Sequence, residues 1–519
     1  MTGEIFGAPM TRRTLVGLAT TAGLGTALTG CRVQTTSDNG DAGGAAESGK
    51  IKFPDPMGDL PTEDVTYRAM MSGGIKQPYF EAVWKAFQDA HSNITMQLDA
   101  TDWKRINEVI PLGVRNDTAP DMFQKPQNVP VQVMVNEGWV APLDDIIPDF
   151  EEWKKNYPAG AFIPGVHVFD GKTYSWTFTS SRSQYGQLMF YDSALMSKAE
   201  LDPTTDRFTW DDFRAAAKKI TDQGDGKSYG LFIAGTNKLG STIMDFAELA
   251  GLPGGEMDFS TGEYNFTQPL LRDAIDLMLS VKDDGSMFPG YISLTQNEVD
   301  ARFPQGKAGI TFSGAWDVAN WERDAPDYEY GLAMPPMPNS GEMHHTVFTE
   351  GTAAPLYAYA DSKYPAITGE LLRYMGSVEG QVMLIILTKG IFASEIEEAN
   401  EQAKRSDLVS GKAKQAGDIM ADLRRISPMP QQANEDVAEV ILAQKKVQPD
   451  FADVMQGVFS GQVSNIDKAL QDLQDRMNKS LDDAIEAARK KGADVSRDDW
   501  VFPNWDPDTD YTLDMYESR

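Results

Sequence analysis

The sequence predicts an α/β protein of two or more lobes, and three observations lead to this expectation. Short apolar strands alternate with amphipathic helices, which is typical of parallel sheets with crossover helices. The alternation begins near Asp59 and is repeated in the middle of the chain. A length of 519 residues also exceeds what one hydrophobic core usually serves.

The first part of the chain reads as strand, helix, strand, helix, strand. Residues 65–71 form an apolar strand that ends at Ser-Gly-Gly. Residues 78–91 place Phe80, Val83, Trp84 and Phe87 on one helical face. Further expected elements are a strand at 93–100, a helix at 102–117 that breaks near Gly113, and a strand at 119–124. Ligands of such sheets bind beyond the carboxyl ends of the strands.

The middle and the end of the chain repeat these patterns and then become helical. The expected elements are strands at 229–235 and 307–316 and helices at 241–251, 268–285 and 361–385. Residues 464–492 predict one long acidic helix, capped by Ser464 or Asn465 and stopped by Gly492.

The charge and the rare residue types exclude several classes of function. The formal net charge is −30, so nucleic acid and anionic membrane surfaces would be repelled. A single cysteine excludes an intrachain disulfide and a cysteine-built zinc or iron–sulfur site. With only four histidines in addition, we expect neither a metal centre nor a cofactor.

The lone cysteine, Cys31, stands at the end of an export signal. Arg12-Arg13 precede an uncharged stretch at 14–30 that is too short and too rich in Gly and Thr for a good membrane span. The end of this stretch, Leu-Thr-Gly-Cys, resembles the lipobox of bacterial lipoproteins, which implies that Cys31 carries a lipid. The alternative is a buried helix with an incidental cysteine. The export route, twin-arginine or general, stays open.

Several segments, in order, resemble the extracellular solute-binding proteins of ABC importers, the family that includes maltose-binding protein. The best matching segment is RFPQGKAGITFSGAWDVANW. The other matching segments are TAPDMFQ…APLDDII, DGKTYSWTF…MFYDSAL, FTWDDFRAAAKKI, MPPMPNSG with EGTAAPLYAYADSKYPAITGELLRYMGSVEGQ, and GQVSNIDKALQDLQDRMNKSL. The chain departs from the pattern at Thr177, where the family has proline, and in the extra tail at 496–519.

The resemblance implies a type II periplasmic-binding-protein-like fold with two lobes, three hinge crossings and a ligand cleft between the lobes. The expected parts are an export signal (1–30), a flexible linker (31–58), lobe 1 (59–182 plus 350–395) and lobe 2 (183–349 plus 396–519). It further implies a monomer without enzymatic activity, anchored on the extracytoplasmic face of the cell membrane. Such a protein captures a neutral sugar, expected to be an oligosaccharide, and delivers it to the permease subunits.

The resemblance and the strand ends together nominate the ligand-binding residues. Trp316 matches the family's sugar-stacking tryptophan, and Arg182 could capture a carboxylate if the ligand were acidic. The complete set of candidates is Ser72, Gly73, Gly74, Trp103, Gln124, Lys125, Gln127, Arg182, Gln184, Tyr185, Thr236, Asn237, Trp316, Asp317 and Glu350. Ordinary roles remain open for them: core packing for Trp103 and Trp316, turns or solvated loops for the strand-end residues, and a helix cap for Asp317.

Two further patterns and two other functions stay open. The acidic tail at 506–517 has the spacing of a calcium loop but lacks its glycine, and His344-His345 lie in a polar loop. The first alternative function is a secreted glycoside hydrolase, because 77 acidic residues could include a catalytic pair. The second is a binding protein for a peptide, a polyamine or a uronate.

Overall fold

The structure is a computed structural model that describes residues 51–158, 160–184, 186–204, 208–236, 238–349, 355–406 and 408–519. Contacts divide the chain into Met1–Ala42 and Gly43–Arg519, and every described residue belongs to the second unit. The predicted export signal and Cys31 lie outside the described residues.

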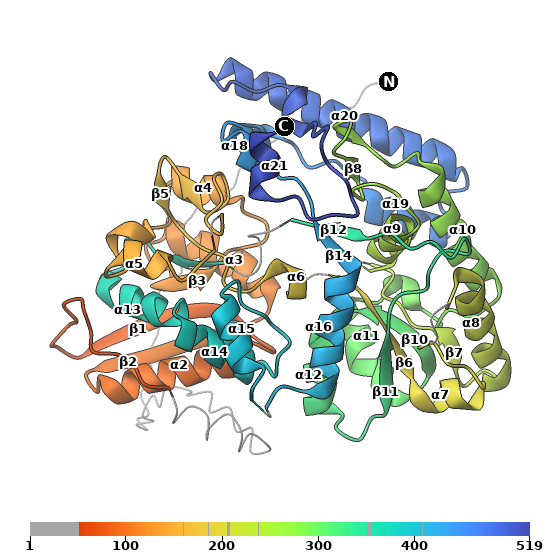
Figure 1. Cartoon of the computed structure of the whole chain (residues 1–519), viewed down its shortest axis with the longest axis horizontal. Helices are drawn as coiled ribbons and strands as arrows, with labels where there is room; N and C mark the ends of the chain where they lie inside the picture. The colour runs from red at the N-terminus through yellow and green to blue at the C-terminus, as the bar shows by residue number, and fades with distance from the viewer. Residues whose placement is uncertain are drawn as a thin grey trace, which may run out of the picture. The chain divides into compact units, whose positions relative to one another are not determined.

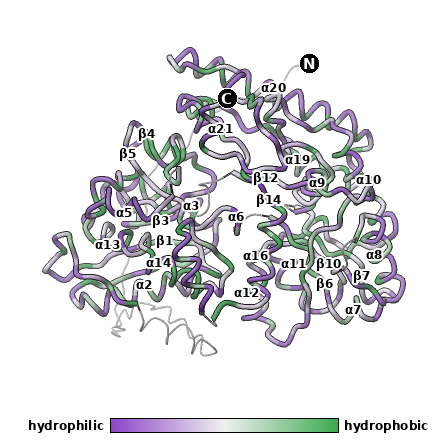
Figure 2. The backbone as a smooth tube through the Cα atoms, viewed as in Figure 1, coloured by the Kyte–Doolittle hydropathy of each residue, from purple (hydrophilic) through white to green (hydrophobic). Residues whose placement is uncertain are grey.

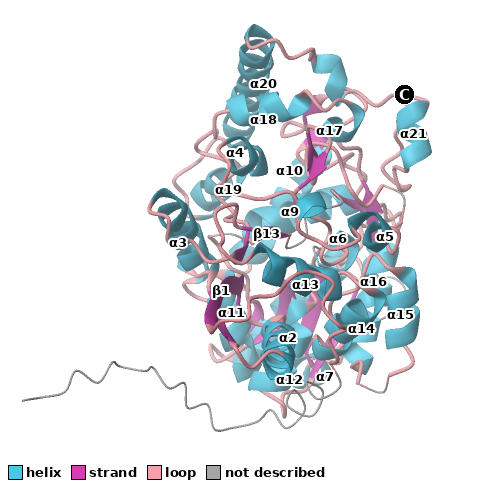
Figure 3. Cartoon of the chain, turned by 90° about the vertical axis from the view of Figure 1, so that its left-hand side faces the viewer, coloured by secondary structure: helices cyan, strands magenta, loops and turns pink. Residues whose placement is uncertain are grey.

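Lobe 1 contains a four-stranded sheet with the order β13-β3-β1-β2. Strands β2 and β3 run parallel to β1, and β13 runs antiparallel to β3. Helix α2 packs on this sheet with the buried face that includes Phe80 and Phe87. Figures 1 and 3 show α2, α13 and α14 beside these strands. The predicted strand–helix–strand order of this part of the chain is confirmed.

Lobe 2 contains a second four-stranded sheet with the order β11-β6-β10-β7. Strand β10 is parallel to β7, whereas β6 is antiparallel to both β10 and β11. All six residues of β10 are buried, because helices cover the sheet. The strands of both sheets are largely green, that is hydrophobic, in Figure 2.

The described elements have the following bounds. In the first half they are β1 (Val65–Ser72), α2 (Gln77–Ala90), β2 (Ile94–Thr101), α3 (Trp103–Arg115), β3 (Met122–Gln124), α4 (Val131–Asn136), α5 (Phe150–Lys154), β4 (Val168–Phe169), β5 (Lys172–Thr173), α6 (Ser181–Gln184), β6 (Leu188–Asp192), α7 (Ser193–Lys198), α8 (Trp210–Gly224), β7 (Tyr229–Leu231), α9 (Leu239–Leu249), β8 (Met257–Asp258) and β9 (Glu263–Tyr264). In the second half they are α10 (Pro269–Asp283), α11 (Gln296–Arg302), β10 (Ala308–Ser313), α12 (Trp316–Asp324), β11 (Tyr330–Ala333), β12 (Thr346–Phe348), β13 (Leu356–Ala358), α13 (Pro365–Met375), α14 (Val378–Leu387), α15 (Glu397–Ala403), α16 (Gly411–Leu423), β14 (Arg424–Ile426), α17 (Pro430–Ala433), α18 (Val437–Ala443), α19 (Phe451–Phe459), α20 (Ile466–Lys490) and α21 (Leu513–Glu517).

Two segments outside the ranges 59–182 and 350–395 pack into the core around the first sheet. Ile51, in the expected flexible linker, is 6% exposed and packs into the lobe 1 core. The backbone N–H groups of Met57 and Gly58 donate to Glu370 Oε1 at 2.7 and 2.9 Å. Helix α15 also packs into this core, although the predicted boundary stood at residue 395. Apolar side chains in both segments supply the burial that holds them there.

The strand predicted at 229–235 is shorter in the structure, because β7 ends at Leu231. The chain then packs closely against another segment. A Cβ atom on Gly235 would lie 2.3 Å from the Cα atom of Ile292, so only glycine fits there. Helix α3, by contrast, continues through Gly113 to Arg115 instead of breaking at the glycine.

The C-terminal helix has the predicted cap. The Asn465 side chain accepts a hydrogen bond from the Lys468 N–H, and Gly492 follows the helix with φ of +107°. Residues beyond it form a small aromatic cluster of Phe502, Trp505 and Tyr511, which the sequence did not predict. None of the helices in the described ranges is both long and apolar enough to cross a bilayer.

Candidate functional site

The carboxyl ends of β1 and β3 lie side by side at one edge of the lobe 1 sheet. Gln124 Oε1 accepts a hydrogen bond of 2.6 Å from the Ser72 N–H, so the structure brings these two predicted residues together. Both are buried, and Gln124 is fully so. The next residues, Gly73 and Gly74, are progressively exposed. Gly74 has φ of +88°, and a Cβ atom there would meet nothing within 4 Å. This turn is therefore open to a ligand, and Gln124 positions it.

The loop after β3 holds the next two candidates. Lys125 Nζ donates to the carbonyl oxygens of Pro126 and Val129, at 3.2 and 3.1 Å. Burial lowers the pKa of this lysine. Gln127 is exposed, and its N–H donates to Asn107 Oδ1 at 2.7 Å. Lys125 thus stabilises its own loop, and the side chain of Gln127 faces solvent.

Trp103 begins α3 and packs, partly buried, against a core cluster that contains Ile106 and Phe123. Thr236 also serves the fold, since its hydroxyl group donates to the Leu294 carbonyl oxygen at 2.9 Å. For both residues, the structure supplies the ordinary role that the sequence left open.

Trp316 follows β10 directly and is partly exposed at the start of α12. Its ring folds back over Gly314, where a Cβ atom would lie 2.0 Å from ring atom Cζ3. Glycine at 314 therefore permits this orientation of the ring. The ammonium group of Lys238 lies 5.2 Å from the ring centroid, within cation–π range.

Asp317, next to this tryptophan, is fully buried and forms part of an internal network. Asn320 Nδ2 donates to Asp317 Oδ1 at 3.1 Å, and Gln296 Nε2 donates to Oδ1 of the neighbouring Asp300. Burial raises the pKa of both carboxyl groups, and the mutual repulsion of the two raises that of Asp300 further. Asp317 is therefore inaccessible to a ligand in this structure.

Sequence reasoning missed Lys238 and Asp245, which lie in the same part of lobe 2. Gln187 Nε2 donates to Asp245 Oδ2 at 2.8 Å. Burial raises the pKa of Asp245 to about 6, and Lys238 partly opposes the shift. The signal in the sequence was an acid between Met244 and Phe246 on a largely buried helix.

Ile75 connects the turn at the end of β1 with the core of lobe 2. It follows the exposed Gly74 turn of lobe 1 and packs against the lobe 2 cluster that contains Phe232 and Ala315. Ala315 immediately precedes Trp316. The segment after β1 therefore contacts the core of lobe 2.

Four predicted residues cannot be placed. Tyr185, Asn237, Glu350 and Cys31 lie outside the described residues, and the side chain of Gln184 is not described.

Arg182, the candidate for an acidic ligand, is paired within the chain. Its Nη2 atom lies 2.7 Å from Asp510 Oδ2 in the C-terminal tail. The guanidinium groups of Arg182 and Arg424 lie over the ring of Phe348 in β12, at 5.6 and 4.3 Å from its centroid. Arg424 Nη1 also donates to the carbonyl oxygens of Ser181 and Arg182. A ligand carboxylate would have to displace Asp510.

Comparison with known proteins identifies the family of this chain. Residues 82–405 match the sequence model of the family described as bacterial extracellular solute-binding protein. The chain belongs to this family. A protein of Brucella abortus (strain 2308) that is named as a binding protein is 28% identical over 265 residues. That match covers 51% of this chain and 61% of the relative, so the chain spans less than two thirds of the relative's length.

Solved structures agree on the fold of this solute-binding protein. The cyclic α-maltosyl-1,6-maltose binding protein from Arthrobacter globiformis has a TM-score of 0.55 at 19% identity, over 80% of this chain and 99% of its own. The maltose/maltodextrin-binding domain from Bdellovibrio bacteriovorus, bound to maltotriose, has a TM-score of 0.58 at 18% identity, over 81% and 100%. The ABC transporter solute-binding protein from Thermotoga lettingae, bound with α-D-tagatose, has a TM-score of 0.60 at 18% identity, over 80% and 99%. The predicted type II fold is confirmed.

The acidic tail of this solute-binding protein does not gather its carboxylates around one point. Asp508 lies 2.8 Å from Nδ1 of both His344 and His345, and Asp510 is paired with Arg182. Within the described ranges, no three or more His, Cys, Asp or Glu side chains are grouped so that they could hold a metal ion.

Proposed function

We propose that this solute-binding protein captures a carbohydrate, specifically an oligosaccharide, and delivers it to the permease subunits of an ABC importer. It would act as a monomer, held by a lipid on Cys31 to the extracytoplasmic face of the cell membrane. Membership of the extracellular solute-binding family supports this proposal. The sugars named for the three structures of like fold support the substrate class.

The position of Trp316 carries the proposal most directly. A partly exposed indole at the end of β10 offers a flat face to the C–H face of a sugar ring. Glycine at 314 holds the indole there, and Lys238 lies over the same ring. The exposed turn at Gly73–Gly74 supplies backbone groups from the other lobe, which sugar hydroxyl groups could bond.

Binding would proceed by hinge closure of two lobes, with lobe 1 at 59–182 plus 350–395 and lobe 2 at 183–349 plus 396–519. Strand β12 ends next to the proposed second crossing at 349–350, and it pairs in parallel with β14. Bending confined to such crossings would leave both four-stranded sheets intact.

Two observations favour a neutral sugar and binding without chemistry. The Asp510 carboxylate already occupies Arg182, which weakens the case for a uronate. The neighbouring carboxyl groups of Asp300 and Asp317 are buried, at 8% and 0% exposure, whereas glycosidase carboxyl groups flank the scissile bond of a bound substrate. We therefore propose that the protein releases the bound sugar without cleaving it.

Calorimetric titration with a series of neutral oligosaccharides tests the substrate. An anchoring aromatic residue contributes about 2 kcal/mol or more, so Trp316→Ala should raise Kd about 30-fold. Trp316→Phe, which keeps a ring, should lose much less. Trp103→Ala is the matched control, because that tryptophan packs in a core. Equal losses in Trp316→Ala and Trp103→Ala would contradict a stacking role. Chromatography of the recovered glycan should show no cleavage, and cleavage products would favour the hydrolase.

Membrane fractionation tests the anchor. The native chain should sediment with membranes and carry an acyl modification on Cys31 by mass spectrometry. Cys31→Ser should release it into the soluble extracytoplasmic fraction. Membrane retention of the serine variant would argue against a lipid on this residue.

A further inference from the structure

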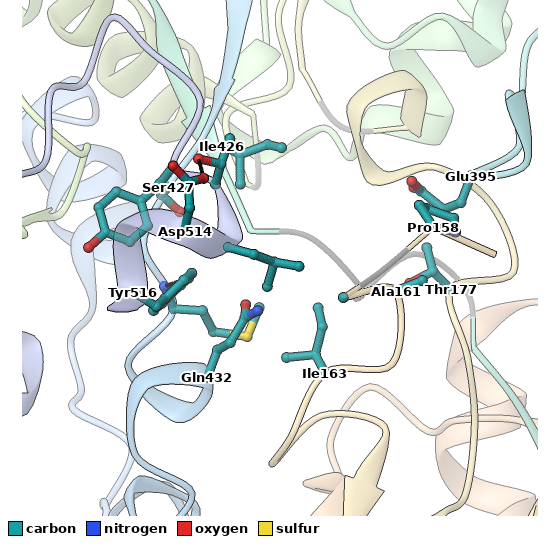
Figure 4. Close-up of a pocket in the computed structure, with 15 residues that line it drawn as sticks. Pro158, Ala161, Ile163, Thr177, Glu395, Ile426, Ser427, Gln432, Asp514 and Tyr516 are labelled. Carbon is teal, nitrogen blue, oxygen red and sulfur yellow. Dashed lines mark hydrogen bonds between the residues drawn. The ribbon is translucent and has the colours of Figure 1, made fainter. Parts of the chain in front are cut away.

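A second cavity lies away from Trp316, where the C-terminal tail meets lobe 1. It has a volume of about 370 Å³, which falls in the range of about 300–1,000 Å³ that is common for ligand pockets. Figure 4 shows Ala161, Ile163, Thr177 and Glu395 on one side of it. On the other side lie residues of the segment 426–432 and of the tail.

Nine of the fifteen residues that line this cavity lie beyond the family match, which ends at residue 405. The contributions from beyond that point are Ile426, Ser427, Met429, Gln432, Tyr511, Thr512, Leu513, Asp514 and Tyr516. Hydrogen bonds hold the wall that they form in place. The Tyr511 N–H donates to the Ile426 carbonyl oxygen at 2.9 Å, and the Met429 N–H donates to the Tyr516 hydroxyl oxygen at 2.8 Å. Most of the lining of this cavity therefore comes from the part of the chain beyond the family match.

Glu395 leaves one polar atom unsatisfied at this cavity. Its Oε1 is buried and accepts no hydrogen bond from any residue that the structure describes. The carboxyl group does interact with the Ser180 side chain and with the charge of Arg182, while burial raises its pKa. A buried carboxylate oxygen without a donor costs free energy that a ligand N–H could recover.

The other groups at the wall favour a positive charge. Glu395 and Asp514 bring two carboxyl groups to the cavity, and no lysine, arginine or histidine is found among its fifteen described lining residues. The rings of Tyr511 and Tyr516 lie in the same wall, with centroids 4.8 Å apart. Aromatic rings and carboxylates together are the usual partners of organic ammonium groups.

We propose that this cavity binds a small organic cation that carries an ammonium N–H, independently of the carbohydrate at Trp316. The ammonium group donates to Glu395 Oε1 on the lobe 1 side of the cavity. The carboxyl group of Asp514 adds attraction from the tail side.

The test is calorimetric titration of the purified full chain with 1,4-diaminobutane and with glucosamine. Choline, a cation without an N–H donor, and glucose, a neutral sugar of similar size, are the comparison probes. We expect the primary amines to bind at one site and choline to bind at least about tenfold more weakly, because a charge-assisted hydrogen bond contributes about 1.5–3 kcal/mol.

Matched variants locate the site. Glu395→Gln keeps the size of the side chain and should raise Kd for the amines about tenfold or more. Glu517→Gln removes an exposed acid of the same tail that does not line the cavity, so it should leave Kd unchanged. Trp316→Ala should also leave amine binding unchanged. Each variant is compared with the native chain by thermal unfolding, which shows that it is folded.

Three results would overturn the proposal. The folded native chain could bind no primary amine. The primary amines and choline could bind with equal affinity, or Glu395→Gln and Glu517→Gln could weaken amine binding equally. Either result would indicate general electrostatic attraction to a chain of net charge −30. Finally, glucose alone could bind in a manner that depends on Glu395, which would replace the cation by a neutral sugar. Loss of amine binding in Trp316→Ala would instead show that the amines bind in the carbohydrate cleft.

Discussion

Arg182 and Asp510, which are 328 positions apart in the chain, form an ion pair of 2.7 Å. Arg182 lies at the proposed first passage of the chain from lobe 1 to lobe 2, and Asp510 lies in the tail. The other oxygen of Asp510 accepts the Ile426 N–H of β14 at 2.9 Å. One tail residue therefore ties the first crossing to the strand β14.

We expect Asp510→Ala to destabilise the protein by about 1 kcal/mol, mainly through the lost hydrogen bond to the Ile426 N–H. The ion pair adds little, because both side chains are about one third exposed, at 31% and 33%. Urea unfolding measures the loss, and a double-mutant cycle with Arg182→Met gives the coupling. A coupling near zero together with an unchanged midpoint would show that the tail does not hold the crossing.

Gly314→Ala should weaken sugar binding without unfolding the protein. The new Cβ atom would lie 2.0 Å from the Trp316 ring, so the indole must turn away. The expected result is a loss of affinity similar to that of Trp316→Ala in calorimetry, with the far-ultraviolet circular dichroism unchanged. Full affinity in the folded variant would mean that the position of the indole is unimportant.

Gly417→Ala is the matched control for that change, and it makes a prediction of its own. Gly417 lies inside α16, and a Cβ atom there would meet nothing within 4 Å. Alanine should stabilise the protein by up to about 1 kcal/mol, because it loses less backbone entropy in a helix. Thermal unfolding should show a higher midpoint with unchanged sugar affinity. A lower midpoint would contradict the packing around α16.

Asp245 should make stability depend on pH between about 4 and 6. Its folded pKa, raised mainly by burial to about 6, exceeds the ordinary value of 3.8. The folded state therefore binds this proton more tightly than the unfolded state does. The resulting contribution to stability is complete below the ordinary pKa of 3.8 and is lost as the pH rises through the folded pKa of about 6. Asp245→Asn should flatten this part of the stability profile, measured by urea unfolding at several pH values. Identical profiles would contradict the burial of this carboxyl group.

Local patterns in the sequence predicted much of the fold. The spacing of Phe80, Val83 and Phe87 marked α2, and Asn465 marked the start of α20, because helix faces and caps are encoded within a few residues. The sequence nominated Trp316 because it follows Gly314 at a strand end and matches the family's stacking tryptophan, and its binding role stays a prediction.

The parts that the sequence did not predict depend on distant contacts. Nothing near Asp510 indicates that it pairs with Arg182, and nothing near Ile51 indicates that it joins the lobe 1 core. Lys238 and Asp245 became candidates only when the structure placed Lys238 beside the Trp316 ring and within the electrostatic reach of Asp245. Side chains that only folding brings together have no characteristic spacing in the sequence, so a local pattern cannot predict their contact.

A thermal-shift screen of the full chain tests the central claim most directly, with neutral oligosaccharides, uronates, peptides and polyamines as probes. A ligand that binds only the folded state raises the midpoint of unfolding. We predict a rise with one series of neutral oligosaccharides that is lost in Trp316→Ala and retained in Glu395→Gln. No rise with any neutral sugar, beside a clear rise with peptides or uronates that depends on Trp316, would contradict the carbohydrate assignment.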